Sequence, residues 1–517
     1  MGAHYSDTLR GYVDNFPVRF ITIALLLMTL AAPQLQGAER RTIGLSQKGA
    51  RVEAIVVEGE SQKAPVVVLV GGLEGSGASS RAVEREAGRY ESTSQIRRTF
   101  KLIAIPQPNP ERNRLQFPPQ GIAYRENVES HVLWRWIGSQ APDLTIVVGD
   151  DFGLVEALSQ NAVAGFGKIP STHMDATANL LSAVSSSLPV SQAHAEFERR
   201  QARFPRQLAD ELAQVYGRDF DQLTYIPGMA LIGQLRLGNT AEVVKLAGRY
   251  LDGRDNLVRA NSLTLAGHLV FAELAEKTND PRYTELVRKA ADTGFTETGA
   301  MKASMPYHDE MSDSVFMAVP LLAKAGKLTG DRKYFDMAAR HLAFMQKLVL
   351  RPDGLYRHSP LTDAAWGRGN AFPALGLALA LSDFPKDHPA YEEMVTAFVQ
   401  HMSNLAPLQN EDGLWLQVVD HPGAYAEFSA TAMIGAAIRR GIRNGWLDTR
   451  TYQPIVERAW HAVLGRVGPD GVLLDVSEST NKQRSLEDYL RRAAILDRDP
   501  RGGAMALIFA TEMAGLE

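Results

Sequence analysis

The stretch Asp353-Gly354-Leu355-Tyr356 returns later in the chain in related form, as DGLW at 412–415 and as DGVL at 470–473. The three copies lie 59 and 58 residues apart, and each stands between amphipathic patterns that predict helices. A second pair of similar segments, TNDPRY at 278–283 and TGDRKY at 329–334, also separates helical patterns. A unit that holds two helices and a turn is a helical hairpin, which cannot bury its apolar face alone.

Residues 190–517 have room for five or six such hairpins. This number favours a closed all-α toroid, the (α/α)₆ barrel, over an open solenoid. A solenoid would need a polar terminal cap, whereas the chain ends in the apolar stretch AMALIFATEM at 504–513. We therefore expect the last helix to pack back onto the ring.

Residues 39–189 have a different pattern and predict a separate α/β domain. Short, apolar, β-branched runs at 51–58, 65–70, 102–105 and 144–148 are typical of strands that are covered on both faces. Helical candidates at 79–90 and 126–139 alternate with them, which favours a mostly parallel sheet. Residues 152–189 are rich in Ala, Ser and Gly and are expected to form a mixed connection.

Composition narrows the classes of function. The 517 residues include 55 Lys and Arg against 59 Asp and Glu, a net charge of −4, and no basic stripe that would suit nucleic acid is present. The chain has no cysteine, which excludes disulfides, thiol nucleophiles and Cys-ligated metals. We expect no cofactor and no metal site.

The N-terminus predicts export. An apolar run at 20–32 follows Arg19 and precedes the small residues Gly37 and Ala38. Its length is that of a signal-peptide core and is short for a membrane span. We expect residues 1–38 to be a signal peptide, the mature protein to be periplasmic or secreted, and no stable membrane span after cleavage. A buried N-terminal helix is the alternative. The oligomeric state is left open.

Candidate functional residues interrupt the helical pattern of the second region at three places. In the first, His308 and several acidic residues crowd ahead of an apolar helix that begins after Asp313, although Asp313 also suits a helix N-cap. In the second, Trp366 and Arg368 alternate with glycines, an arrangement that suits a sugar site or a structural Trp–Arg stack. In the third, Trp415 starts a segment that could equally be a surface loop.

These segments resemble unsaturated glucuronyl and rhamnogalacturonyl hydrolases, glycoside hydrolase families 88 and 105. The similar motifs are SDSVFMAVPLL at 312–322, LTGD at 328–331, WGRGN at 366–370, DGLWLQ at 412–417, EFSATAM at 427–433 and GWLD at 445–448. They occur in the family's order, and the resemblance extends over residues from about 255 to 517. It implies the (α/α)₆ fold that the repeats predict independently.

The resemblance also implies a mechanism that differs from ordinary glycoside hydrolysis by two carboxylates. Such an enzyme hydrates the C4=C5 double bond of a 4,5-unsaturated uronic acid at the non-reducing end of a lyase product, and the resulting hemiketal collapses to release the next sugar. Asp313 matches the catalytic acid and base, and it must then hold a proton, which burial or a nearby Asp309 or Glu310 would favour. By the same resemblance, Arg368 is expected to hold the uronate carboxylate and Trp366 to stack on the sugar. The remaining substrate-binding candidates are His308, His358, Asn370, Trp415 and Asn261.

One position departs from the family pattern. The family has a second acidic residue on an earlier helix, and the counterpart here is Asn261 or Ser262. An amide can hydrogen-bond a sugar but cannot share a proton with Asp313.

The first region resembles zinc carboxypeptidases over about 110 residues. The similar segments are IGLS at 43–46, GGLEGSG at 71–77, IPQPNP at 105–110 and PDLTIVVGD at 142–150. Where that family has its zinc ligands, this chain has Glu74, Gly77 and Gly149. We therefore expect a zinc-free relative that serves in binding or docking.

Two other functions remain open. The chain could be a catalytically inactive carbohydrate-binding or scaffold protein with two degenerate enzyme domains. It could also keep the toroid and catalyse a different reaction, as a sugar epimerase or an ordinary inverting hydrolase.

Overall fold

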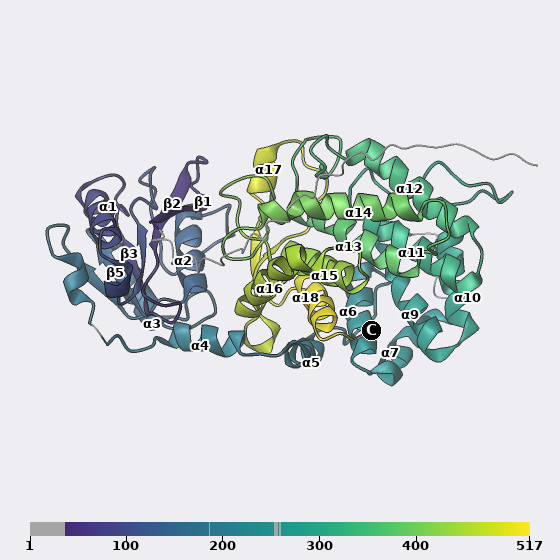
Figure 1. Ribbon diagram of the computed structural model, residues 1–517, viewed down its shortest axis with the longest axis horizontal. Helices are drawn as coiled ribbons and strands as arrows, with labels where there is room; N and C mark the ends of the chain where they lie inside the picture. The colour runs from purple at the N-terminus through teal and green to yellow at the C-terminus, as the bar shows by residue number, and fades with distance from the viewer. Residues whose placement is uncertain (1–36, 186, 253–256, 258–259, 517) are drawn as a thin grey trace, which may run out of the picture. The chain divides into compact units, whose positions relative to one another are not determined.

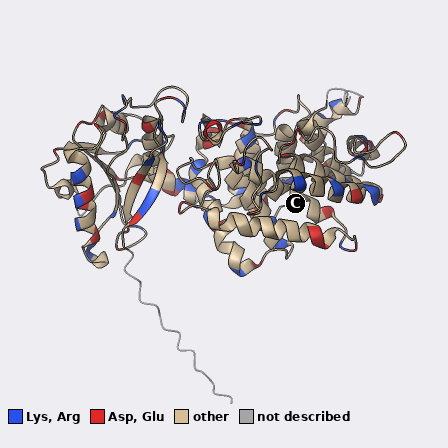
Figure 2. Ribbon diagram, turned by 90° about the horizontal axis from the view of Figure 1, so that it is seen from above, with Lys and Arg blue, Asp and Glu red and all other residues tan. Residues whose placement is uncertain are grey.

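The computed structural model describes residues 37–516, apart from 186, 253–256 and 258–259. The expected signal peptide, with its apolar run at 20–32, lies almost entirely outside the described residues. In the described part of the chain, no helix combines the length and the apolar character needed to cross a membrane. Lys and Arg are interspersed with Asp and Glu over the described chain (Figure 2), in keeping with the small net charge of −4.

Six strands form the sheet of the first region, in the order β1-β2-β4-β3-β5-β6. Strands β4, β3, β5 and β6 run parallel, whereas β1 and β2 pair antiparallel at one edge. The strands are β1 (Glu39–Leu45), β2 (Arg51–Val57), β3 (Val66–Val70), β4 (Lys101–Ile105), β5 (Leu144–Val148) and β6 (Ser171–Met174). The stretch 152–189 was expected to be a mixed connection, and it completes this sheet with β6 and adds α3 (Leu154–Gln160).

Both faces of the central sheet are covered, which is why β3, β4 and β5 are almost entirely apolar. Val68 and Val70 of β3 pack with α2 (Val128–Gln140) and α3 on one face. Val67 and Leu69 pack with α1 (Ala78–Glu91) on the other face. Alternate residues of one strand therefore enter two separate apolar cores, and α1 and α2 flank the sheet in Figure 1.

The second region closes into a ring. Among the described residues, six inner helices contact one another in succession, with α8 and α9 acting as one helix broken at His268, and α18 returns to contact α6. The inner helices are α6 (Tyr225–Arg236), α8 (Ser262–Gly267) with α9 (Leu269–Thr278), α11 (Ser314–Thr329), α13 (Gly367–Asp383), α15 (Phe428–Arg443) and α18 (Pro500–Met513). The hairpin prediction and the return of the last helix onto the ring are confirmed.

A second layer of helices surrounds this ring. Five of them follow their inner partners along the chain: α7 (Thr240–Ala247), α10 (Pro281–Asp292), α12 (Lys333–Val349), α14 (Tyr391–Leu405) and α16 (Thr449–Arg466). The sixth, α5 (Pro205–Val215), precedes α6 and packs against α18. Figure 1 shows α5 near α18, so the two ends of the helical region meet. A further helix, α4 (Gln192–Gln201), lies between the sheet and α5 in the chain and contacts α16.

The repeated Asp-Gly pairs follow outer helices. Gly354, Gly413 and Gly471 adopt φ values of 79°, 84° and 75°, in the left-handed region that glycine tolerates without a steric penalty. These turns reverse the chain toward the next inner helix. The local requirement for a glycine explains the periodicity visible in the sequence.

Strands in the helical region were not expected. The chain forms β7 (Leu473–Ser477), the short helix α17 (Leu486–Leu490) and β8 (Ala494–Asp497) between α16 and α18. The two strands pair antiparallel with an irregularity at Asp475, whose φ is 64°. By their contacts, the described residues from 37 to 516 form one compact unit. The predicted boundary between 189 and 190 stays a prediction.

Candidate active site

The inner helices present their N-terminal ends on one side of the ring. Tyr225, Asn261, Asp313, Trp366, Glu427 and Asp499 each lie at the N-cap or first position of an inner helix. The helix dipoles direct their positive ends to this side, and side chains already cap the N–H groups at the starts of α8, α15 and α18.

Asp313 occupies the N-cap position of α11 without capping the helix. Its φ and ψ of −51° and −32° are helical, and its side chain accepts no hydrogen bond from the first turn. Atom Oδ1 is buried, has no hydrogen-bond partner, and lies 3.3 Å from Nε2 of His358. The N-cap alternative therefore does not describe this carboxylate, which is 16% exposed and available for chemistry.

His358 is fully buried and lies between Asp313 and Tyr489. Its Nδ1 is 2.7 Å from the Tyr489 hydroxyl, which in turn accepts a hydrogen bond from the backbone N–H of Gln483 at 3.2 Å. Burial raises the pKa of Tyr489 to about 12, so its hydroxyl keeps its proton near neutrality. Sequence reasoning missed Tyr489, since no local pattern in α17 connects it to a histidine 131 residues away.

Trp366 and Arg368 lie beside this group. The His358 and Trp366 rings have centroids 4.6 Å apart, and the guanidinium carbon of Arg368 lies 4.7 Å from the centre of the Trp366 ring. Trp366 is only 1% exposed, and its Nε1 is buried without a partner. The structural Trp–Arg stack is thus the alternative that the structure shows, and Trp366 has no open face for a sugar.

Both terminal nitrogens of Arg368 donate hydrogen bonds within the protein. Nη1 donates to the Ser429 hydroxyl at 3.0 Å and the Ser477 carbonyl at 2.9 Å, and Nη2 donates to the Glu478 carbonyl at 2.9 Å. The Glu427 carboxylate lies 3.9 Å away. Three of the five N–H groups of Arg368 thus serve the framework, and its contact with a uronate carboxylate stays a prediction.

Glu427 is a buried acid whose local role is structural. Its carboxylate accepts hydrogen bonds from the backbone N–H groups of Ser429 and Ala430 at the start of α15, and from Ser477 N–H at 2.9 Å. Glu427 is fully buried, so its carboxylate belongs to the framework beneath the surface.

Three other predicted residues serve the framework. Asn370 is buried and bonds through its amide to the backbone of Tyr356 and Trp366, so it has no free group for a sugar. Trp415 is fully buried, and its Nε1 donates to the Leu405 carbonyl at 2.7 Å. Asn261 caps α8 in a capping box with Thr264. The hydrogen bonds of these three side chains go mainly to backbone groups at helix starts, helix ends and turns.

The loop before α11 places His308 at the edge of the site. The His308 ring packs against Phe344 with centroids 5.1 Å apart, and it lines a cavity of about 530 Å³ together with Tyr307 and Lys482. Lys482 pairs with Glu310 at 3.1 Å across this cavity.

Tyr225 at the start of α6 is a further group that sequence reasoning missed. It packs edge-on against Phe316 of α11 and Phe372 of α13. Burial raises the pKa of Tyr225 to about 12; the positive charge of Arg368 opposes this shift and the negative charge of Asp313 adds to it. The hydroxyl therefore belongs to the electrostatic surroundings of both residues.

The first region brings together the three positions at which zinc ligands were considered. A Cβ added at Gly77 or at Gly149 would lie 3.4 Å from Oε1 of Glu74. The hydroxyl of Ser79 donates to that oxygen, and the other oxygen of Glu74 is buried without a partner. In the described part of the chain, no three His, Asp or Glu side chains are grouped so that they could hold a metal ion. The resemblance to carboxypeptidases stays a prediction.

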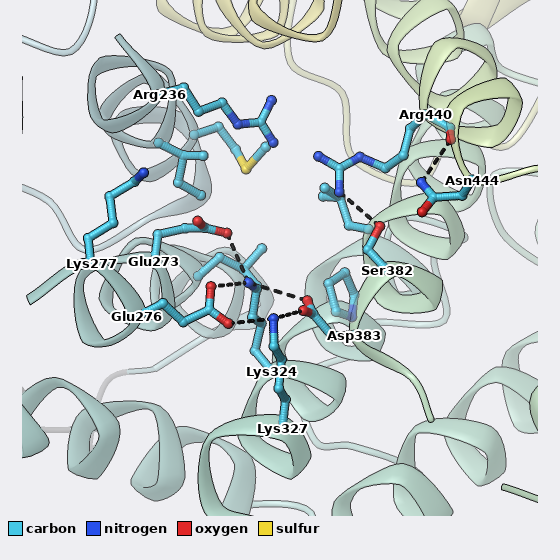
Figure 3. A pocket seen from close by; sticks show the side chains of 15 residues that line it. Arg236, Glu273, Glu276, Lys277, Lys324, Lys327, Ser382, Asp383, Arg440 and Asn444 are labelled. Carbon is cyan, nitrogen blue, oxygen red and sulfur yellow. Dashed lines mark hydrogen bonds and ion pairs between the residues drawn. The ribbon is translucent and has the colours of Figure 1, made fainter. Parts of the chain in front are cut away.

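A second polar site lies at the C-terminal ends of the inner helices. The cavity there has a volume of about 410 Å³. Lys324 lies 3.1 Å from Glu273, 2.9 Å from Glu276 and 3.3 Å from Asp383, and Figure 3 shows these side chains directed toward one another. Burial by itself would lower the pKa of Lys324, but these carboxylates together raise it above its ordinary value. Since helix C-termini carry negative partial charge, cations are favoured here. This cluster ties the ring together away from Asp313.

Comparisons with known proteins relate the helical region to glycoside hydrolases. Residues 241–516 match the family described as Glycosyl Hydrolase Family 88. An unsaturated rhamnogalacturonyl hydrolase of Bacillus subtilis is 29% identical over 186 residues, which cover 34% of this chain and 52% of that protein. An unsaturated 3S-rhamnoglycuronyl hydrolase of Formosa agariphila is 30% identical over 180 residues, which cover 30% of this chain and 48% of that protein. The chain thus spans about half the length of these curated relatives.

Solved structures show the same fold. A family 105 glycoside hydrolase of C. acetobutylicum has a TM-score of 0.51 at 20% identity, covering 60% of this chain and 99% of that one. A family 88 glycosyl hydrolase of Bacteroides vulgatus has a TM-score of 0.51 at 17% identity, with the same coverage. The family match extends over more than half of the sequence, and the chain belongs to glycosyl hydrolase family 88.

Proposed function

We propose that this protein is a glycoside hydrolase that releases a 4,5-unsaturated uronic acid from the non-reducing end of oligosaccharides made by polysaccharide lyases. The observation that carries the proposal is the free carboxylate of Asp313, which lies 3.3 Å from His358 and neither caps its helix nor bonds elsewhere through Oδ1. Family membership and the names of the two curated relatives support the same substrate class.

In the proposed reaction, Asp313 donates its proton to C4 of the double bond. Positive charge develops at C5, and the ionised Asp313 then takes a proton from water as that water adds to C5. The product is a hemiketal at C5, which opens by breaking the bond between C5 and the ring oxygen, so that C5 becomes a ketone and the ring oxygen becomes a hydroxyl on C1. The hemiacetal formed at C1 then breaks its bond to the glycosidic oxygen and becomes an aldehyde, and its hydroxyl proton passes to that oxygen, which leaves as the alcohol of the next sugar. No covalent enzyme intermediate is needed, so one carboxyl group serves where ordinary glycosidases use two.

The surroundings of Asp313 suit an anionic sugar. The dipoles of the inner helices direct their positive ends to this side, and Arg368 adds a buried cation that is partly balanced by Glu427 at 3.9 Å. His358 is held by Tyr489 and faces Asp313 through Nε2. By changing tautomer, its ring can accept a hydrogen bond from the carboxylic acid or donate one to the carboxylate of Asp313. Asn261 keeps the helix cap in place of the family's second acid.

The test is release of the unsaturated sugar from lyase-digested pectin and glycosaminoglycan, followed as the loss of ultraviolet absorbance of the double bond. Asp313→Asn should lower the rate by about 100-fold or more, the range typical of general acid–base groups. Asp387→Asn is the matched control, because it makes the same change on an exposed residue of the loop after α13, and it should stay close to wild type. An unchanged rate in Asp313→Asn would refute the mechanism.

An inactive wild-type protein that binds these oligosaccharides in calorimetry would instead support the carbohydrate-binding alternative. Activity on saturated glycosides would support an ordinary inverting hydrolase. We also propose export to the periplasm or the medium, on the strength of the apolar run at 20–32. Cell fractionation and N-terminal sequencing of the recovered protein test this.

A further inference from the structure

The segment between α16 and α18 supplies backbone and side-chain groups to the site around Asp313. The carbonyls of Ser477 and Glu478 accept from Arg368, and the N–H of Ser477 donates to Glu427. Twelve residues further along, Tyr489 bonds to Nδ1 of His358, and its own carbonyl accepts from the side chain of Gln417 at 2.7 Å. The segment 473–497 thus holds the buried cation and the histidine of the site from one side.

The same segment is embedded in the α/β region. Strand β7 divides its side chains between two cores, because Leu473 and Val476 pack in the core of the ring, whereas Leu474 packs in the core beside α2 and β3. The irregularity at Asp475 allows this division, since an inserted residue redirects the side chains of a strand. Asp475 itself is buried and pairs with Arg135 of α2 and, at 3.0 Å, with Arg466 of α16.

Arg125 and Arg491 connect the rest of the segment to the α/β region through hydrogen bonds. Arg125 donates to the Glu478 carboxylate at 2.6 Å and to the Arg491 carbonyl at 2.9 Å. Arg491 in turn donates to the carbonyls of Ser46 and Gln47, after β1. Rings add a further contact, since Tyr124 stacks on Tyr425 with centroids 4.4 Å apart.

We infer that the α/β region, residues 39–189, acts as a positioning module for the catalytic site of the ring. It holds residues 473–497 so that the Ser477 and Glu478 carbonyls fix Arg368 and the Tyr489 hydroxyl fixes His358 opposite Asp313. This role requires no ligand in the α/β region. The catalytic consequence rests on the proposed function, whereas the mechanical coupling does not.

Arg125→Ala in the full chain tests the coupling. Arg125 is 37% exposed, and Glu478 keeps its second partner Arg492 at 2.8 Å, so the variant should fold. Hydrogen–deuterium exchange should become faster in residues 478–493 and in residues 355–366, which carry His358. Arg81→Ala is the matched control, because Arg81 is exposed on α1 at the other face of the sheet, and it should leave both peptides unchanged. Faster exchange in 478–493 alone, or in neither peptide, would overturn the inference.

The kinetic readout separates positioning from general destabilisation. At 25 °C, Arg125→Ala should lower kcat about tenfold with KM changed less than about twofold, as expected when a reacting group is displaced slightly. Arg125→Lys should recover part of the rate, since it keeps the charge opposite Glu478. An unchanged kcat together with faster exchange would overturn the positioning role. A wild-type protein with no activity on unsaturated uronides would refute the proposed function, and the exchange experiment would still decide the coupling.

Discussion

Acid is expected to weaken the fold through His341, a fully buried side chain of α12. Its Nδ1 accepts a hydrogen bond from Met305 N–H at 3.1 Å, and its Nε2 lies 3.2 Å from the Ser314 carbonyl. Both partners can be satisfied only by a neutral ring protonated at Nε2. His341 thereby joins the two ends of the loop that precedes the catalytic helix.

Burial, assisted by the nearby charge of His308, lowers the pKa of His341 to about 4 from the ordinary 6.5. The unfolded chain therefore binds the proton more readily than the folded chain between these two values. The stabilisation is complete above pH 6.5 and is lost as the pH falls toward 4, by about 3 kcal/mol in all. Between pH 7 and pH 5 the loss due to His341 is about 2 kcal/mol.

Urea unfolding of wild type and His341→Gln at pH 7 and pH 5 measures this contribution. Gln accepts the Met305 N–H bond but does not titrate, so the variant should lose about 2 kcal/mol less than wild type on acidification. Other buried histidines with lowered pKa values, His131 and His401, affect both proteins equally. His461→Gln, at an exposed position of α16, is the control and should lose as much as wild type. Equal losses in His341→Gln and wild type would refute the reasoning.

Two further substitutions probe opposite ends of the ring. Lys324→Met removes the cation that three carboxylates share in the cavity of Figure 3, although Glu276 and Asp383 keep Lys327 as a partner. The free energy of unfolding should therefore fall by about 3 kcal/mol in urea titrations, while the folded protein keeps its activity; an unchanged stability would contradict the ion-pair assignment. Arg368→Lys cannot reach Ser477, Glu478 and Ser429 together, so thermal and urea unfolding should show a loss of about 1.5–3 kcal/mol, and a neutral result would mean that these bonds contribute little.

Whether a predicted site residue can face a ligand depends on the hydrogen-bond partners that its side chain has in the folded protein. Asp313 and His358 were predicted and lie together, because the family motif places one at the start of α11 and the other in the loop before α13. The carbonyl partners of Arg368 lie 109 and 110 residues away in the chain, so no local motif could have predicted them. Asn370 and Trp415 proved to be framework residues, which the same motifs do not distinguish from ligand-facing ones.

By itself, the sequence determined the features that depend on near neighbours. Glycines with positive φ fixed the turns at 354, 413 and 471, apolar periodicity fixed the inner helices, and continuous β-branched runs fixed the covered sheet. Only the tertiary structure decided that α5 completes the ring against α18, that β7 divides its side chains between two cores, and that Tyr489 reaches His358. The physical reason is that turns and caps are stabilised within a few residues, whereas a buried hydrogen bond selects its partner only after distant segments have packed together.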